Sequence, residues 1–126
     1  MSYISSMRDH TKLRAFELAD ALVLLIYRKT ALFPREEQFG LTSQLRRAAV
    51  SIASNVVEGC ARSSARDYIR FLQMAYGSAC EVQYQLSLAR RLEYVAGQNA
   101  DELDELSREV CKVLNGLLRS LSDISP

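Results

Sequence analysis

The chain has few residues that interrupt helices and no long apolar segment. Its 126 residues include only five glycines and two prolines, while 48% are apolar and 25% are charged. This composition is typical of a single helical globular domain. No stretch alternates apolar and polar residues with a period of two, so we expect no β-strands. The longest apolar run, Ala21 to Tyr27, is too short to cross a bilayer, and residues 1–11 lack the apolar centre of a signal peptide.

Other absences argue against particular functions. Sixteen basic and fifteen acidic residues leave a net charge of +1, which argues against a dedicated nucleic-acid-binding protein with a strongly basic surface. The charge is uneven, because residues 1–95 carry 13 Lys and Arg against 9 Asp and Glu, whereas residues 96–126 carry 3 against 6. The three cysteines, Cys60, Cys80 and Cys111, predict neither a disulfide framework nor a zinc site. We expect a soluble, cytoplasmic protein with no metal, no other cofactor and no contact with a membrane.

Proline, glycine and serine residues divide the chain into four helical segments. Their expected boundaries are near residues 12–32, 41–62, 64–94 and 99–121. Pro34 ends the first segment, Thr42 or Ser43 caps the second, Ser63 or Ser64 the third, and Asn99 the fourth. Four amphipathic helices joined by short loops predict an all-α, antiparallel up-down-up-down four-helix bundle. Residues 1–11 are expected to form a mobile N-terminal tail, and residues 12–126 a single bundle domain.

The second segment has three faces of different chemistry. Its expected core stripe is Leu41, Leu45, Ala49, Ile52 and Val56. A polar stripe on one flank consists of Arg47, Ser51, Asn55 and Glu58. These polar side chains follow one another at spacings of three and four, so we expect them to form a structural network, although the same groups could hold a ligand. The third face, which includes Val50 and Val57, is apolar again.

The first segment also has more apolar residues than one buried face requires. Its expected inward stripe is Phe16, Ala19, Val23, Ile26 and Thr30. A second ridge of leucines is expected on nearly the opposite side. Together with the third face of the second segment, this ridge would make a larger exposed patch than monomers usually carry. We therefore predict an oligomer interface that consists of Leu18, Leu22, Leu25, Val50 and Val57.

The third and fourth segments each carry one regular apolar seam. The seam of the third segment is Tyr68, Leu72, Ala75, Ala79, Val82, Leu86 and Ala89. The seam of the fourth is Leu103, Leu106, Val110, Val113, Leu117 and Leu121. Both repeat at steps of three and four, which is the spacing of helices that pack nearly parallel or antiparallel to one another.

Several short motifs occur in a distinctive order along the chain. They are Phe33-Pro34, QLRRA at 44–48, Glu58-Gly59 and GSACE at 77–81. Their order resembles the four-helix-bundle family encoded by intervening sequences within bacterial 23S rRNA genes, and the resemblance covers roughly residues 12–95. It implies a ring-shaped homopentamer, because a related accessory protein of diversity-generating retroelements is a pentameric barrel that binds a reverse transcriptase and nucleic acid. It implies no known activity.

Two kinds of function remain open at this point. One is a non-enzymatic, self-assembling protein that offers a composite surface to a partner, either RNA or DNA or a nucleic-acid enzyme. Ring symmetry would repeat a small local excess of positive charge and so produce a large basic surface. The candidate phosphate contacts are Arg46, Arg47, Arg62, Arg66 and Arg70. The alternative is a purely structural or protein–protein adaptor with no nucleic-acid contact. We predict no catalytic residues, because no nucleophile is paired with a base and the single histidine, His10, lies in the tail.

Overall fold

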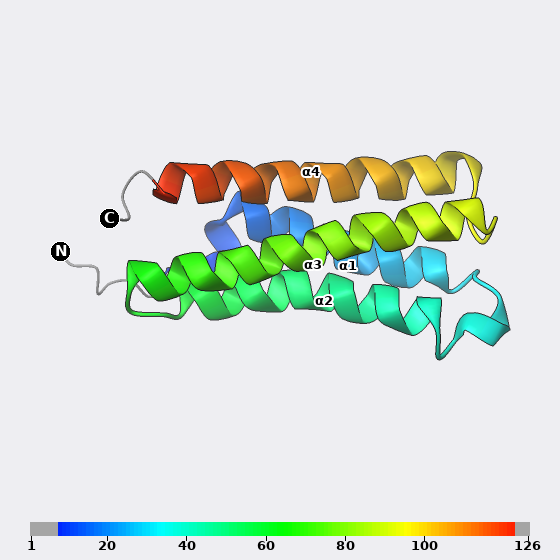
Figure 1. Ribbon diagram of the computed structural model, residues 1–126, viewed down its shortest axis with the longest axis horizontal. Helices are drawn as coiled ribbons and strands as arrows, with labels where there is room; N and C mark the ends of the chain where they lie inside the picture. The colour runs from blue at the N-terminus through cyan, green and yellow to red at the C-terminus, as the bar shows by residue number, and fades with distance from the viewer. Residues whose placement is uncertain (1–7, 123–126) are drawn as a thin grey trace.

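The computed structural model describes residues 8–122 as four long helices (Figure 1). They are α1 (Arg14–Thr30), α2 (Leu41–Cys60), α3 (Ala65–Arg91) and α4 (Gly97–Ser122), with short 3-10 turns η2 (His10–Lys12) before α1 and η3 (Arg35–Glu37) between α1 and α2. No strand occurs in the part of the chain that is described. The prediction of an all-α protein with four helices is confirmed.

The four helices lie side by side along the long axis of the molecule (Figure 1). Helix α1 packs against α2 and α4, and α3 packs against the same two helices. In Figure 1 the α1–α2 and α3–α4 links lie at the same end of the molecule. Because each helix packs against two others, one stripe of its side chains faces a common core.

The core stripes of α2 and α3 are those expected from the sequence. All five residues of the α2 stripe and all seven of the α3 seam are buried. The α4 stripe is wrong in part, because Leu103 and Val110 are buried together with Ala100, Ser107 and Leu114, whereas the other four expected residues are only partly buried.

The buried face of α1 differs from the expected one in a way that bears on assembly. It consists of Ala15, Ala19, Leu22, Ile26 and Thr30. Leu22 has 0% exposure, so its assignment to an oligomer interface is wrong. The buried residues recur at steps of three and four from Ala15, and this stripe includes Leu22 and leaves Val23 on its flank.

A carboxylate fixes the link between α1 and α2. The Leu41 backbone N–H donates to Glu37 Oε1 at 2.8 Å, and the Tyr94 hydroxyl donates to Glu37 Oε2 at 2.8 Å. These bonds lower the pKa of Glu37, the Leu41 contribution being larger, and hydrogen bonding to Glu37 raises the pKa of Tyr94. A Cβ atom at Gly40 would lie 2.5 Å from Glu37 Oε1, which explains the glycine. The expected cap at Thr42 or Ser43 is therefore wrong, since the Glu37 carboxylate satisfies the first turn of α2.

The starts of the last two helices give one confirmed prediction and one correction. Ser64 caps α3, and its hydroxyl accepts a hydrogen bond from the Asp67 backbone N–H at 3.1 Å. Helix α4 begins at Gly97, whose φ of +60° suits glycine, and not after an Asn99 cap. The Asn99 side chain instead accepts a hydrogen bond from Lys29 Nζ at 2.7 Å.

The acidic first turns of α4 are paired with cations from neighbouring helices. Arg90 on α3 contacts Asp101 at 3.1 Å and Asp104 at 2.8 Å, and Lys29 on α1 contacts Glu102 at 3.1 Å. Hydrogen bonds to Asp101 and then Asp104 raise the pKa of Arg90. Part of the negative charge of α4 is thus balanced within the chain.

Residues 8–11 lie against the bundle. The Arg8 backbone N–H donates to the Cys60 carbonyl at 3.1 Å, and the Arg8 guanidinium lies 3.8 Å from the centre of the Tyr68 ring. The His10 ring meets Phe16 edge-on at 4.7 Å. Residues 1–7 lie outside the described residues, so the mobility of the tail stays a prediction.

Candidate functional site

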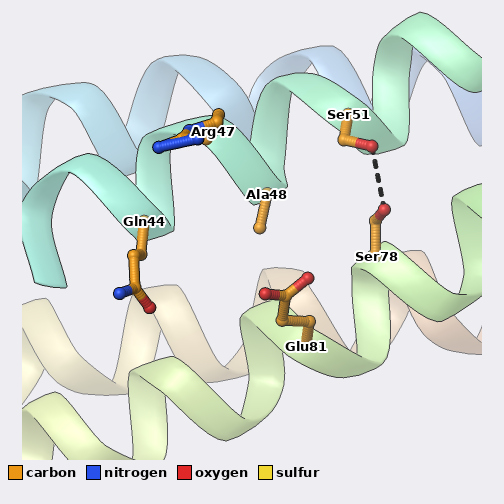
Figure 2. A pocket seen from close by; sticks show the side chains of 6 residues that line it. All are labelled: Gln44, Arg47, Ala48, Ser51, Ser78 and Glu81. Atoms are coloured by element: carbon orange, nitrogen blue, oxygen red, sulfur yellow. Dashed lines mark hydrogen bonds between the residues drawn. The ribbon is translucent and has the colours of Figure 1, made fainter.

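A polar groove lies between α2 and α3 (Figure 2). It has a volume of about 420 Å³ and is lined by Gln44, Arg47, Ala48, Ser51, Ser78 and Glu81. Figure 2 shows the α2 side chains on one side and the Ser78 and Glu81 side chains rising from α3 on the other. The QLRRA and GSACE motifs of the sequence thus meet across this groove.

The hydrogen bonds beside the groove only partly match the expected polar network. The Ser51 and Ser78 hydroxyls are 2.9 Å apart, and Asn55 Nδ2 donates to the Ser51 carbonyl and hydroxyl at 2.9 and 3.1 Å. Glu58 instead pairs with Arg62 at 3.0 Å. Within residues 8–122 the Arg47 side chain has no hydrogen bond or ion pair. An Arg47–Glu58 network is therefore wrong, while Ser51 and Asn55 do fix the contact between α2 and α3.

The groove offers hydrogen-bonding groups of both kinds. Two hydroxyls, an amide, a guanidinium and a carboxylate line it, and Glu81 Oε2 also accepts a hydrogen bond from Gln85 Nε2 at 3.3 Å. None of its six lining residues is a histidine or a cysteine, so neither serine meets an imidazole or a thiolate there. This arrangement suits recognition of a polar partner better than nucleophilic chemistry.

The five arginines proposed to contact nucleic acid fall into two groups. Arg46 and Arg47 lie in the first half of α2, and Arg62, Arg66 and Arg70 lie around the α2–α3 turn. Helix α2 continues for thirteen residues after Arg47, from there to Cys60, which corresponds to about 20 Å. The structure therefore does not bring them together as one site on a single chain.

Several of these arginines already have partners. Arg46 donates to Thr30 Oγ1 at 2.9 Å and to the Tyr27 carbonyl at 3.2 Å, and so ties α2 to α1. Arg62 pairs with Glu58 at 3.0 Å and Arg70 with Asp67 at 3.8 Å. Both also lie over the Phe71 ring. Arg47 and Arg66 are the two without a hydrogen bond or an ion pair inside the described range.

A second groove lies between α1 and α2, on the apolar third face of α2. This α1–α2 groove has a volume of about 390 Å³ and is lined by Asp20, Val23, Val50, Ala53, Ser54, Val57 and Glu58. Val50 remains 40% exposed. Val50 and Val57 of the expected interface therefore share one surface. Leu18 and Leu25 are not among the residues that line it, and Leu25 instead lines a hollow with Glu102 and Glu105 of α4.

Other apolar side chains of α1 and of the α1–α2 link are exposed, and the sequence did not predict their exposure. Leu24 and Tyr27 on α1 are 51% and 42% exposed. Phe39, in the α1–α2 link, is 90% exposed and lines a hollow together with Tyr27, Arg46 and Val50. The three-residue step from Leu24 to Tyr27 indicates that these two side chains lie on one face of α1. Nothing in the local sequence indicates that Phe39 is exposed.

Two of the three cysteines carry thiols with a raised pKa. Burial raises the pKa of the Cys60 thiol, and burial together with the neighbouring Cys80 raises that of Cys111 to about 11. Cys80 is exposed and follows the buried Ala79 of the α3 seam. Among residues 8–122 no three His, Cys, Asp or Glu side chains are grouped so that they could hold a metal ion. None of the helices within this range is both long and apolar enough to cross a membrane.

The fold and its two grooves define an all-α bundle with one polar and one largely apolar groove on its surface. The chain belongs to the 23S rRNA-intervening sequence protein family, whose model matches residues 11–116. The resemblance inferred from the motifs is thereby confirmed. A crystal structure of a protein with unknown function from the S23 ribosomal protein family of Bacteroides thetaiotaomicron has the same fold, with a TM-score of 0.75 at 24% identity over 83% of this chain and 95% of the other. No curated protein matches the chain significantly.

Proposed function

We propose that this protein is a non-enzymatic scaffold that assembles with copies of itself and presents a repeated surface to a partner. In this proposal each chain is an antiparallel up-down-up-down bundle, and five chains close into a ring. The observation that supports it is the apolar surface beside the α1–α2 groove, where Tyr27, Phe39 and Val50 line one hollow and are all at least 40% exposed. Large contiguous apolar surface of this kind is characteristic of association sites.

A ring would also repeat the polar groove around its circumference. The groove stays open in one chain, with Arg47 unpaired inside the described range and Glu81 opposite it. Repetition turns a modest site into a multivalent surface, which raises avidity for an extended partner without any new contact.

The mass of the assembly in solution tests this proposal directly. Multi-angle light scattering at micromolar concentration should give about five times the chain mass of 14.2 kDa. Dilution should shift the mass cooperatively towards that of one chain. A mass of one chain at all accessible concentrations would refute the proposal.

Nucleic acid is a second candidate partner, favoured by the arginines around the α2–α3 turn. Arg62, Arg66 and Arg70 lie within nine residues of one another, and Arg66 has no ion pair in the described part of the chain. Repeated around a ring, these groups would attract phosphates with little sequence preference and with strong salt dependence. The acidic α4 would have to face away from the bound strand.

A titration with labelled RNA at low and at moderate salt distinguishes this candidate from a protein adaptor. Binding that falls steeply with salt, and that the Arg66→Glu, Arg70→Glu double variant loses, would support phosphate contact. The matched control is Arg108→Glu, Lys112→Glu on α4, which changes the charge equally. No binding even at low salt, or equal loss in both double variants, would favour the alternative of a structural protein–protein adaptor.

A further inference from the structure

We infer that Phe39 is the anchor of the contact between chains, and that it docks into the α1–α2 groove of a second copy of this protein. This inference rests on the proposed self-assembly and specifies its two surfaces. One surface is the projecting aromatic ring in the α1–α2 link. The other is the groove lined by Val23, Val50, Ala53 and Val57.

The link holds Phe39 in a defined position although its ring contacts little else. Two residues before it, Glu37 is tied to the Leu41 backbone and to the Tyr94 hydroxyl, both at 2.8 Å. The Gly40 N–H donates to the Glu37 carbonyl at 2.9 Å and so closes the turn around Phe39. A phenylalanine that is 90% exposed on such a constrained turn is already arranged for binding, and little conformational freedom is lost when it docks.

The α1–α2 groove has the size and chemistry to receive an aromatic ring. Its volume is about 390 Å³, and four of its seven lining side chains are apolar. Phe39 of the same chain lines the neighbouring hollow and is not among the residues that line this groove. The groove is therefore left open for the ring of a second copy.

Charges around the two surfaces are complementary. Asp20 lines the groove, and Arg47 lines the hollow next to Phe39. Within residues 8–122 neither side chain has an ion pair or a hydrogen bond. Docking would bring a cation beside Phe39 towards an anion at the groove, which favours one orientation of the two chains.

When Phe39 and the groove of one chain contact two different neighbours, the interface is head-to-tail. Repetition of such a contact closes a ring when its rotation divides a full turn evenly. A two-fold dimer would instead pair both surfaces of one chain with both surfaces of the same partner. The inferred contact is therefore compatible with the proposed pentamer, and the mass of the wild-type assembly distinguishes a ring from a two-fold dimer.

The first test compares Phe39→Ala with Leu32→Ala as a matched control. Leu32 lies in the same link and is 74% exposed, so neither change should unfold the chain, which circular dichroism verifies. Truncation of an anchor residue should weaken association at least about 30-fold, whereas the control should stay within about twofold of wild type. If wild type assembles and Phe39→Ala assembles equally well, the docking inference fails while self-assembly stands. If wild type itself is a single chain, both fail.

A mixing experiment tests the contact between Phe39 and the groove. Val57→Arg places a bulky charge in the groove, outside the hollow that Phe39 lines, and leaves Phe39 intact. Phe39→Ala keeps the groove and lacks the ring. Each variant alone should be a single chain, and an equimolar mixture should form a dimer and nothing larger, since only one contact can form. A mixture that remains single-chain, or that restores the full assembly, would overturn the inference.

Discussion

The substitutions Leu22→Ala and Leu24→Ala test most directly which face of α1 lies in the core. Leu22 is 0% exposed, and Leu24, two residues later on the same helix, is 51% exposed. Both positions lie well inside α1, and Leu→Ala changes the intrinsic helix propensity by the same small amount at each. The pair Leu22→Ala and Leu24→Ala therefore differs mainly in burial.

The expected cost of Leu22→Ala follows from the atoms removed and the space they leave. Three buried carbon atoms contribute about 2.4 kcal/mol of transfer free energy. The residual cavity among the core side chains adds to this, so we expect the free energy of unfolding to fall by roughly 3 to 5 kcal/mol. For a chain of this length that is a loss of roughly 10 °C or more in the melting temperature. Leu24→Ala should cost less than about 1 kcal/mol.

Urea unfolding followed by far-ultraviolet circular dichroism measures both costs. All proteins should be compared at one concentration, because assembly makes the apparent stability concentration-dependent. Light scattering on the same samples should show that Leu24→Ala weakens association more than its effect on unfolding explains. Equal destabilisation by the two variants, or dissociation by Leu22→Ala without loss of stability, would refute the assignment of Leu22 to the core.

Two further predictions concern the ends and the interior of the helices. Hydrogen bonds lower the pKa of Glu37, so the stabilisation by its carboxylate is complete above the ordinary pKa of 4.5 and is lost as the pH falls through the lowered pKa. Thermal melts between pH 7 and 2 should show that Glu37→Gln removes this part of the acid sensitivity. Gly59→Ala should lower the free energy of unfolding by about 1 to 3 kcal/mol, because the added Cβ would lie 3.0 Å from Phe71 Cβ. Gly77→Ala should raise the free energy of unfolding by about 0.5 to 1 kcal/mol, since the added Cβ meets no neighbouring atom within 4 Å. Urea titrations in which both glycine variants change the stability in the same direction would contradict this account.

The buried faces of α2 and α3 could be predicted residue by residue. In each helix only one set of positions at steps of three and four is apolar along the whole length, and the further apolar face of α2 with Val50 and Val57 is short, so amphipathicity identifies the buried face. Ser64 could be recognised as a cap for a similar reason, because capping depends on a hydroxyl and a backbone N–H three residues apart. These features depend on local geometry, which sequence spacing determines.

The face of α1 could not be decided in this way. Leucines at 18, 22, 24 and 25 surround the helix, so more than one stripe is apolar enough to form a core. Only the positions of α2 and α4 decide that Leu22 is buried and Leu24 remains exposed. The same applies to the arginines, since the part of α2 that follows Arg47 separates Arg46 and Arg47 from the three arginines around the α2–α3 turn.

What the sequence by itself determined is the helical class, the two unambiguous core stripes and the family. The tertiary structure decided which surfaces remain uncovered. Phe39 is the clearest case, because its turn is fixed by the hydrogen bond between Glu37 and Tyr94, which are 57 residues apart. Exposure depends on which distant side chains arrive next to a residue, and spacing along the chain carries no information about that.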